Sequence, residues 1–280
     1  MKSKGRILAL ISLFLTICPI AASAWDEPTS FGARFSADAD YKIRRGLHAF
    51  VSEELRLGGT NLFDRSYTEI GISYRMTDYL KASVSYTAIV VYESEITELD
   101  KNTRIVRYWY AWRHRLTADI TGTIKAGQWR FSLRERLQGT YKVGEINNFQ
   151  QPQTAWVLRS RLKASYKFRP VPLQPYVYLE PRIIFNGAKW SSGAYGPGYE
   201  ESEFIGHNDV YMNRLRGALG IEWKLSSSHT IDFYGLYDRL WDKEIDARKE
   251  GSTKGVGLKA PIKQVTGNRI SIGVGYKFEF

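Results

Sequence analysis

The sequence predicts an all-β protein, namely an antiparallel transmembrane β-barrel of about 10–12 strands of the bacterial outer-membrane type. Residues 268–280 alternate apolar and polar side chains and stop on Phe280, which suits a closed barrel with an apolar outer face and an aromatic rim. About ten further segments alternate with the period of two that marks a half-buried strand. Beyond residue 24 no stretch approaches the roughly 18 consecutive apolar residues of a membrane helix, so a membrane-spanning chain must be a barrel.

The first 24 residues are predicted to be a secretory signal peptide. Three basic residues precede an apolar run over 7–20, and small residues lead to a cleavage site near Ala24. The mature chain, 25–280, is then a single barrel domain in the outer membrane of a Gram-negative cell. Loss of the three cations lowers its formal charge from +11 to +8.

Cys18, the only cysteine, lies inside that peptide, so the mature chain is expected to have no disulfide framework and no cysteine-based metal site. A lipoprotein attachment site at Cys18 is the alternative, which the bulky Ile17 before it disfavours. A basic chain also fits nucleic-acid binding, but an exported chain rarely meets nucleic acid and carries no motif for it here. We therefore expect no nucleic-acid partner and no cofactor.

The mature chain contains eleven alternating segments separated by turn residues or polar loops. In 128–142, the clearest of them, Trp129 and Phe131 face one way and Arg130 faces the other. Glu135 falls on the apolar face there, which indicates a bulge or a position at the membrane interface. In chain order the segments are 31–43, 46–57, 66–76, 79–92, 104–121, 128–142, 155–168, 173–186, 209–225, 229–241 and 268–280.

Five of these segments end on an aromatic, a basic and an apolar residue in succession, and four of the five lead into a short turn. Rings with a basic residue between them are typical of the girdle at the lipid–water boundary, and short turns belong to the periplasmic side. The alternative is that such alternation is simply common in β proteins. The predicted periplasmic girdle consists of Tyr41, Tyr74, Tyr166, Trp223, Tyr276 and Phe280.

The longer connections, at 93–103, 143–154, 187–208 and 242–267, would then face outward from the cell. The first holds the acidic cluster Glu93, Glu95, Glu98 and Asp100. This cluster could bind divalent cations, or outer-leaflet sugar phosphates through them. A solvated loop is the simpler interpretation.

The orientation of the segments raises a problem of strand number. If both 31–43 and 268–280 run toward the periplasm, the count between them is odd, whereas single-chain bacterial barrels have even numbers. Either the first segment threads the lumen and ten strands form the wall, or residues 25–31 contain part of a twelfth strand.

Five runs of the chain carry a family resemblance: Phe63 to Arg75, Leu80 to Tyr86, Trp129 to Gln138, Leu158 to Tyr166 and Asn213 to Gly220. Through them most of the mature chain resembles an uncharacterised family of outer-membrane barrels, the domain of unknown function 2490. The resemblance implies a barrel without an established activity, and it supplies no catalytic residues.

Basic residues gather on the predicted inner face of three successive strands, whereas acidic residues of that face lie mostly elsewhere. Arg182, Arg214 and Arg216 extend the basic set further round the wall. The predicted lumen residues are Arg107, Arg113 and Arg115, then Arg130, Arg134 and Arg136, then Arg159, Arg161 and Lys163.

Two interpretations of this lumen remain open. Guanidiniums that face water attract carboxylate and phosphate, so the protein would be a small passive channel that prefers anionic solutes. Alternatively, the interior is narrow, and arginines that reach Glu54, Glu69 or Glu180 would fill a non-conducting structural barrel. The segregation of basic from acidic positions favours the channel.

A lipid-modifying enzyme is a second alternative. His207 lies close in sequence to Ser191 and Ser192, but the strict short spacing of histidine and serine on one strand is missing. We therefore expect no enzyme, no catalytic residue and no metal. The expected partners are outer-membrane lipid, a small anionic solute, and the barrel-assembly machinery through the C-terminal strand.

Overall fold

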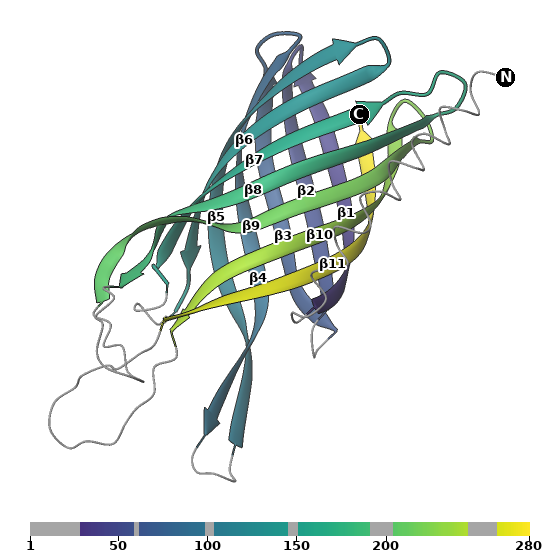
Figure 1. Ribbon diagram of the computed structural model, residues 1–280. Coiled ribbons are helices and arrows are strands. Elements are labelled where there is room, and N and C mark those ends of the chain that lie inside the picture. Colours follow the sequence, from purple (N-terminus) through teal and green to yellow (C-terminus); the bar gives the residue numbers. More distant parts are fainter. Residues whose placement is uncertain (1–28, 59–61, 99–103, 145–150, 191–203, 246–261) are drawn as a thin grey trace, which may run out of the picture.

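The computed structural model describes residues 29–58, 62–98, 104–144, 151–190, 204–245 and 262–280. The predicted signal peptide, 1–24, lies outside these ranges. The described residues form one closed sheet (Figure 1). Its strands are β1 (Thr29–Arg44), β2 (Leu47–Gly58), β3 (Phe63–Arg75), β4 (Leu80–Glu98), β5 (Arg104–Ala126), β6 (Trp129–Lys142), β7 (Thr154–Tyr166), β8 (Leu173–Trp190), β9 (Phe204–Lys224), β10 (His229–Ile245) and β11 (Ile262–Glu279).

The strands follow one another round the barrel in chain order, and β1 closes it by pairing with β11. The neighbours in sequence are antiparallel, whereas β1 and β11 are parallel, in register from Thr29 opposite Asn268 to Asp40 opposite Glu279. The backbone ladder continues at its end, where the Phe280 amide donates to the Asp40 carbonyl at 3.0 Å. The predicted barrel is thus confirmed, with a parallel closing pair.

Both expectations of an even strand number were wrong. β1 is a wall strand and does not thread the lumen, and residues 29–31 belong to β1 itself, so the described strands number eleven. In an up-and-down barrel with an odd number of strands, the first and last strands run in the same direction where they meet. A parallel ladder still satisfies their backbone groups, which is what lipid requires.

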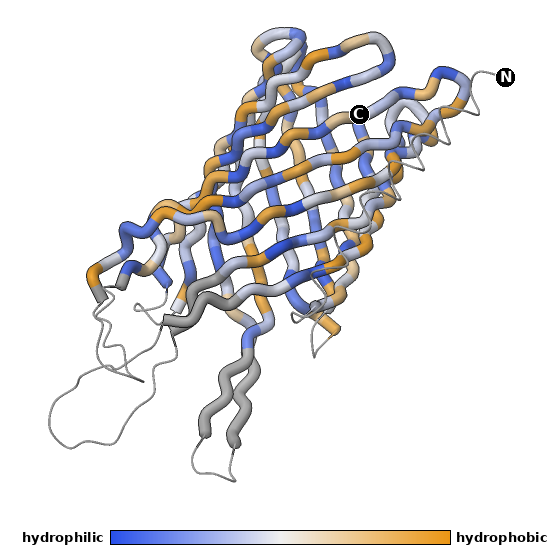
Figure 2. The backbone as a smooth tube through the Cα atoms, viewed as in Figure 1, coloured by the Kyte–Doolittle hydropathy of each residue, from blue (hydrophilic) through white to orange (hydrophobic). Residues whose placement is uncertain are grey.

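Successive residues point alternately to the outside and to the lumen. On β11, Ile272 is 69% exposed while its neighbour Ser271 is 3% exposed. On β1, the exposed Phe31 and Phe35 flank the buried Arg34, and the same alternation of hydropathy follows the strands of the barrel (Figure 2). The outer face is apolar and the inner face polar, as in a membrane barrel. No helix in the described part of the chain is long and apolar enough to span a membrane.

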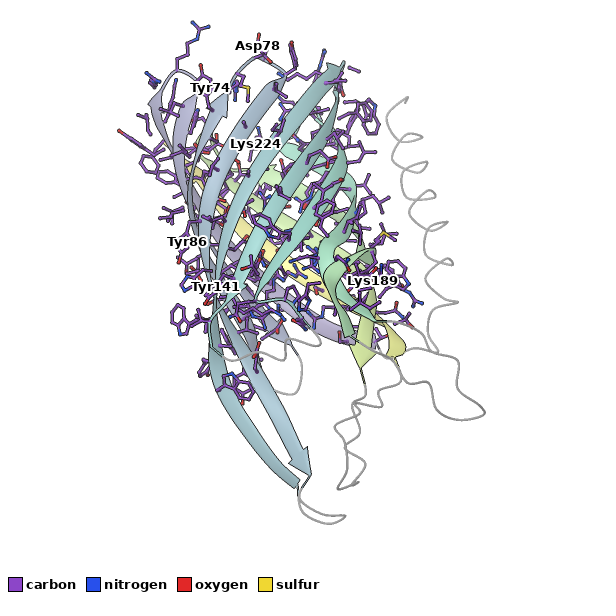
Figure 3. All side chains as sticks on the ribbon, turned by 90° about the vertical axis from the view of Figure 1, so that its left-hand side faces the viewer. Tyr74, Asp78, Tyr86, Tyr141, Lys189 and Lys224 are labelled. Atoms are coloured by element: carbon purple, nitrogen blue, oxygen red, sulfur yellow. The ribbon has the colours of Figure 1, made fainter. Side chains whose placement is uncertain are left out.

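The short turns lie at one end of the barrel and the long connections at the other (Figure 1). Figure 3 shows Tyr74 and Asp78 at the short-turn end, with Tyr141 and Lys189 further toward the opposite end. The predicted girdle residues all lie near the short-turn end: Tyr41, Tyr74, Trp223, Tyr276 and Phe280 are exposed and Tyr166 is half-buried. The rings of Tyr41 and Phe280 are 5.1 Å apart, so the girdle also covers the closing pair.

Several strands run further than the alternation predicted. β4 and β5 continue past the wall as a two-stranded hairpin (Figure 1), so Glu93, Glu95 and Glu98 lie on β4 and not in a loop. The backbone register sets Glu95 opposite Arg107 and Glu98 opposite Arg104. Asp100 lies outside the described residues.

Two smaller expectations also need correction. β9 begins at Phe204, so His207 lies on a strand and not in the connection 187–208. The bulge expected at Glu135 is absent, because β6 keeps a continuous register there with both neighbours. The Ser160 hydroxyl of β7 donates to the Glu135 carboxylate at 2.5 Å and so satisfies part of that outward-facing carboxylate.

Inside the lumen, large rings lie on glycines of the neighbouring strand. A Cβ at Gly220 would lie 2.6 Å from the Tyr176 ring and 2.8 Å from the Phe233 carbonyl oxygen, so this position has room only for glycine. These contacts fix the rings against the wall. The pairs are Tyr176 with Gly220, Tyr234 with Gly273, and Phe50 with Gly71.

Gly220→Ala is expected to lower the free energy of unfolding by about 1–3 kcal/mol, the usual cost of overpacking. Gly217→Ala on the same strand is the control, because a Cβ there would meet nothing within 4 Å. Urea unfolding of the folded barrel in detergent, followed by tryptophan fluorescence, measures both. Equal midpoints for the two variants would contradict the packing argument.

Candidate functional site

The lumen encloses a polar chamber of about 370 Å³. Nearly all the strands contribute to its lining, and most of the lining side chains are charged, polar or aromatic. Because charged side chains from so many strands converge on this chamber, it is the candidate functional site. Its long-loop side is bounded by a network of arginines and carboxylates.

Glu180 of β8 is the centre of that network. Its side chain is 0% exposed. Arg159 donates to its Oε1 at 2.6 Å and Arg161 to its Oε2 at 2.7 Å, while Arg214 and Arg134 approach to 3.5 Å and 3.7 Å. One carboxylate thus compensates four guanidiniums from three strands.

Asp238 and Glu54 extend the network round the wall. Arg216 binds Asp238 through two hydrogen bonds of 2.6 Å and 2.8 Å. Arg34 then links Asp238, at 3.5 Å, to Glu54, at 3.8 Å, and Arg56 also pairs with Glu54. We call this set the charged belt: Arg34, Glu54, Arg56, Arg134, Arg159, Arg161, Glu180, Arg214, Arg216 and Asp238.

Aromatic and amide groups continue the belt across the opposite side. The guanidiniums of Arg56 and Arg115 lie 4.3 Å and 5.6 Å from the Tyr67 ring centroid. On the next strands, Gln138 accepts a 3.4 Å hydrogen bond from Arg159 and donates one of 3.3 Å to Thr117. The contacts of the belt therefore reach most of the way round the lumen.

The belt carries a surplus of positive charge. Its seven arginines share three carboxylates. The register even places arginines directly opposite one another, Arg136 facing Arg159, Arg159 facing Arg182, and Arg182 facing Arg214. Like charges in such positions destabilise a sheet, so the carboxylates of the belt are needed to hold this arrangement.

The chamber beneath the belt has unlike sides. Its basic side is formed by Arg134, Arg136, Arg159 and Arg161, and the lining also includes Arg34, Arg56, Arg115 and Arg216. Its acidic residues are Asp38, Glu69 and Asp232, together with Glu54 of the belt. Between them lies an aromatic wall, the cluster of Tyr176, Tyr178, Tyr234, Leu236 and Ala218. Arg161 stacks on Tyr178 at 4.2 Å and Lys163 on Tyr176 at 3.8 Å.

The structure brings most of the predicted lumen residues together. Arg115, Arg134, Arg136, Arg159, Arg161 and Lys163 all line the chamber. Arg136 pairs with Asp119 at 2.9 Å, and Arg113 pairs with Glu93 further toward the long loops. Arg130 is exposed near the short turns, and the side chain of Arg107 lies outside the described part of the chain.

Sequence reasoning missed Arg34, Arg56, Asp238 and the inward tyrosines. The alternation along the strand could have placed Arg34 on the inner face, since Phe31 and Phe35 mark the outer face of the same strand. Parity would also have placed Tyr176 and Tyr178 inside, since they alternate with the exposed Val177 and Leu179. The glycine on which a tyrosine ring packs is found only through the register.

The residues considered for an enzyme do not form a described site. His207 lies on β9, and Ser191 and Ser192 lie outside the described residues. Within the described ranges, no three His, Cys, Asp or Glu side chains come together as a metal site would need.

The fold and the lumen define a class of protein, a membrane β-barrel with an apolar exterior and an ion-paired, arginine-rich interior. The chain belongs to the family described as protein of unknown function (DUF2490), which matches residues 31–248, so the resemblance seen in the sequence is confirmed. No curated protein matches the chain. Among solved structures it is similar to the outer-membrane expressed OmpT of Vibrio cholerae, with 12% identity and a TM-score of 0.39 over 83% of this chain and 64% of that one. The chain thus spans less than two thirds of that protein.

Glu180→Gln is expected to lower the free energy of unfolding by about 3–5 kcal/mol, because it leaves four half-buried guanidiniums without their shared, fully buried carboxylate. Glu222→Gln is the matched control, since Glu222 binds one lysine and is 23% exposed; its cost is expected to be about 1 kcal/mol or less. Urea unfolding in detergent measures both. A Glu180 variant as stable as the Glu222 variant would contradict the central place of Glu180.

Proposed function

We propose that the protein is a small passive channel of the bacterial outer membrane with a preference for anionic solutes. The observation that carries this proposal is the surplus of arginines over carboxylates in the charged belt, directly beside a polar chamber. An arginine that is paired with a carboxylate keeps its positive charge. The electrostatic field in the lumen is therefore the sum of the contributions of all the charged side chains of the belt. Such a field raises the local concentration of anions in a low-dielectric passage.

The proposal includes the route to the membrane. The signal peptide is expected to be cleaved near Ala24, and β11 with its terminal Phe280 is the segment expected to engage the barrel-assembly machinery. The apolar outer face and the ring of aromatic residues at the short-turn end support insertion with that end in the periplasm.

A non-conducting structural barrel is the second candidate, and a specific observation favours it. The belt contacts run along the inner wall from Glu54 through Asp238 to Glu180 and Arg159, so charged side chains link strands from β2 round to β7. A fully compensated filling of this kind would stabilise the barrel without a path for ions. The surplus of positive charge is what favours the channel over this candidate.

In a planar lipid bilayer, the purified barrel is expected to conduct and to show a reversal potential of the sign that anion preference gives. Replacing Arg134 and Arg159 together by alanine should lower the anion-to-cation permeability ratio by about twofold or more, because two of the belt's surplus cations are removed. Arg130→Ala is the control, since Arg130 is exposed and outside the belt. Absence of conductance from a correctly folded barrel would reject the channel in favour of the structural barrel.

A further inference from the structure

The chamber beneath the belt presents both positive and negative side chains to a ligand. On each of the two sides, one buried polar atom has no hydrogen-bond partner among the described residues. Arg134 Nε and Asp232 Oδ1 are buried and have no hydrogen-bond partner among the described residues. Both residues line the same chamber. A donor and an acceptor therefore remain available at separate places around one cavity.

The basic side is able to bind a carboxylate. Arg134 lies 3.7 Å from its nearest carboxylate oxygen, on Glu180, which is too far for a hydrogen bond. Arg161 lies directly opposite it on β7 and donates its Nε to Glu180. Two guanidiniums side by side, one of them without a full partner, form a fork that matches a carboxylate.

The acidic side is able to bind an ammonium group. The Tyr176 hydroxyl donates to Asp232 Oδ2 at 2.9 Å and leaves Oδ1 unused. Asp38 and Glu69 line the same cavity. Lys163, the cation on this side, already pairs with Glu222 at 2.6 Å, so it leaves the charge of Asp232 largely uncompensated.

We propose that the chamber is a binding site for a small zwitterion, with its carboxylate at Arg134 and Arg161 and its ammonium group at Asp232 and Asp38. The stem of the ligand lies against the aromatic wall. This inference deepens the proposed channel and rests on it for the solute's route, while binding itself requires no conduction. It names the class of solute as amino acids or short peptides with separated charges.

The volume of the chamber and the charges of its lining both support a small zwitterion as the ligand. A chamber of about 370 Å³ lies within the range of about 300–1,000 Å³ for small-molecule sites. Arg161 on β7 and Asp232 on β10 stand three strand spacings apart, about 14 Å along the wall, so the charges of the ligand should be well separated. A simple anion would be repelled by the acidic side and a simple cation by the arginines, whereas a zwitterion satisfies both.

Isothermal titration of the folded barrel in detergent tests the proposal with four probes: ε-aminocaproate, caproate, hexylammonium and glycine. We expect ε-aminocaproate to bind at least about tenfold more tightly than the other three, which corresponds to about 1.4 kcal/mol. Asp232→Asn should reduce its affinity to that of caproate, and Arg134→Gln to that of hexylammonium. Asp78→Asn and Arg130→Gln are the controls, because both residues are exposed and outside the chamber.

The gel mobility of heated and unheated samples shows whether each variant is folded, and Arg134→Lys replaces Arg134→Gln if the latter does not fold. Equal affinities for caproate and ε-aminocaproate would overturn the zwitterion site and leave an anion site. No heat from any probe would overturn both. Neither outcome depends on the bilayer measurement, so failure of this site and failure of the channel are distinguishable.

Discussion

Closure of the backbone ladder is the constraint on which the rest of this structure depends. In lipid, an unpaired amide or carbonyl at a sheet edge costs several kcal/mol, so the first and last strands must meet whatever their direction. Here they meet in parallel, with Asp40 and Glu279 in register. The slanted bonds of a parallel pair are slightly weaker than antiparallel ones, but they leave no edge. The number of strands is thus set by the need to close the ladder, and it does not have to be even.

Closure at eleven strands also decides what the lumen can be. Inward side chains reach past a neighbouring strand, as Arg34 of β1 does when it contacts Asp238 of β10 beyond β11. Arginines that the sequence places in an inward stripe therefore meet carboxylates of the belt while they also line the chamber. Three carboxylates hold the belt together, and the remaining space lies beside it as the chamber. The stability of the barrel and the proposed selection of solutes consequently depend on the same side chains.

The sequence predicted the barrel, the approximate strand positions and most of the basic lumen, because each depends on an alternation of period two that is local to one strand. It did not predict the parallel closing pair, because the eleven alternating segments were weighed against the even strand numbers of single-chain bacterial barrels. Tyr176 and Tyr234 share the inward parity of Glu180 and Asp232, but the glycines on which their rings pack, Gly220 and Gly273, are found only through the register. Whether arginines are paired likewise depends on contacts between strands, such as that of Arg214 on β9 with Asp238 on β10.

The row of arginines that face one another across β6 to β9 bears on how the wall assembles. Arg134 opposes Arg161 and Arg136 opposes Arg159, so the hairpin of β6 and β7 repels itself when it stands alone. Its compensating charges come from the strands on either side, namely Asp119 of β5 for Arg136 and Glu180 of β8 for Arg134, Arg159 and Arg161. This hairpin therefore gains its full stability only when both β5 and β8 flank it, so these two carboxylates couple the docking of three consecutive strand pairs.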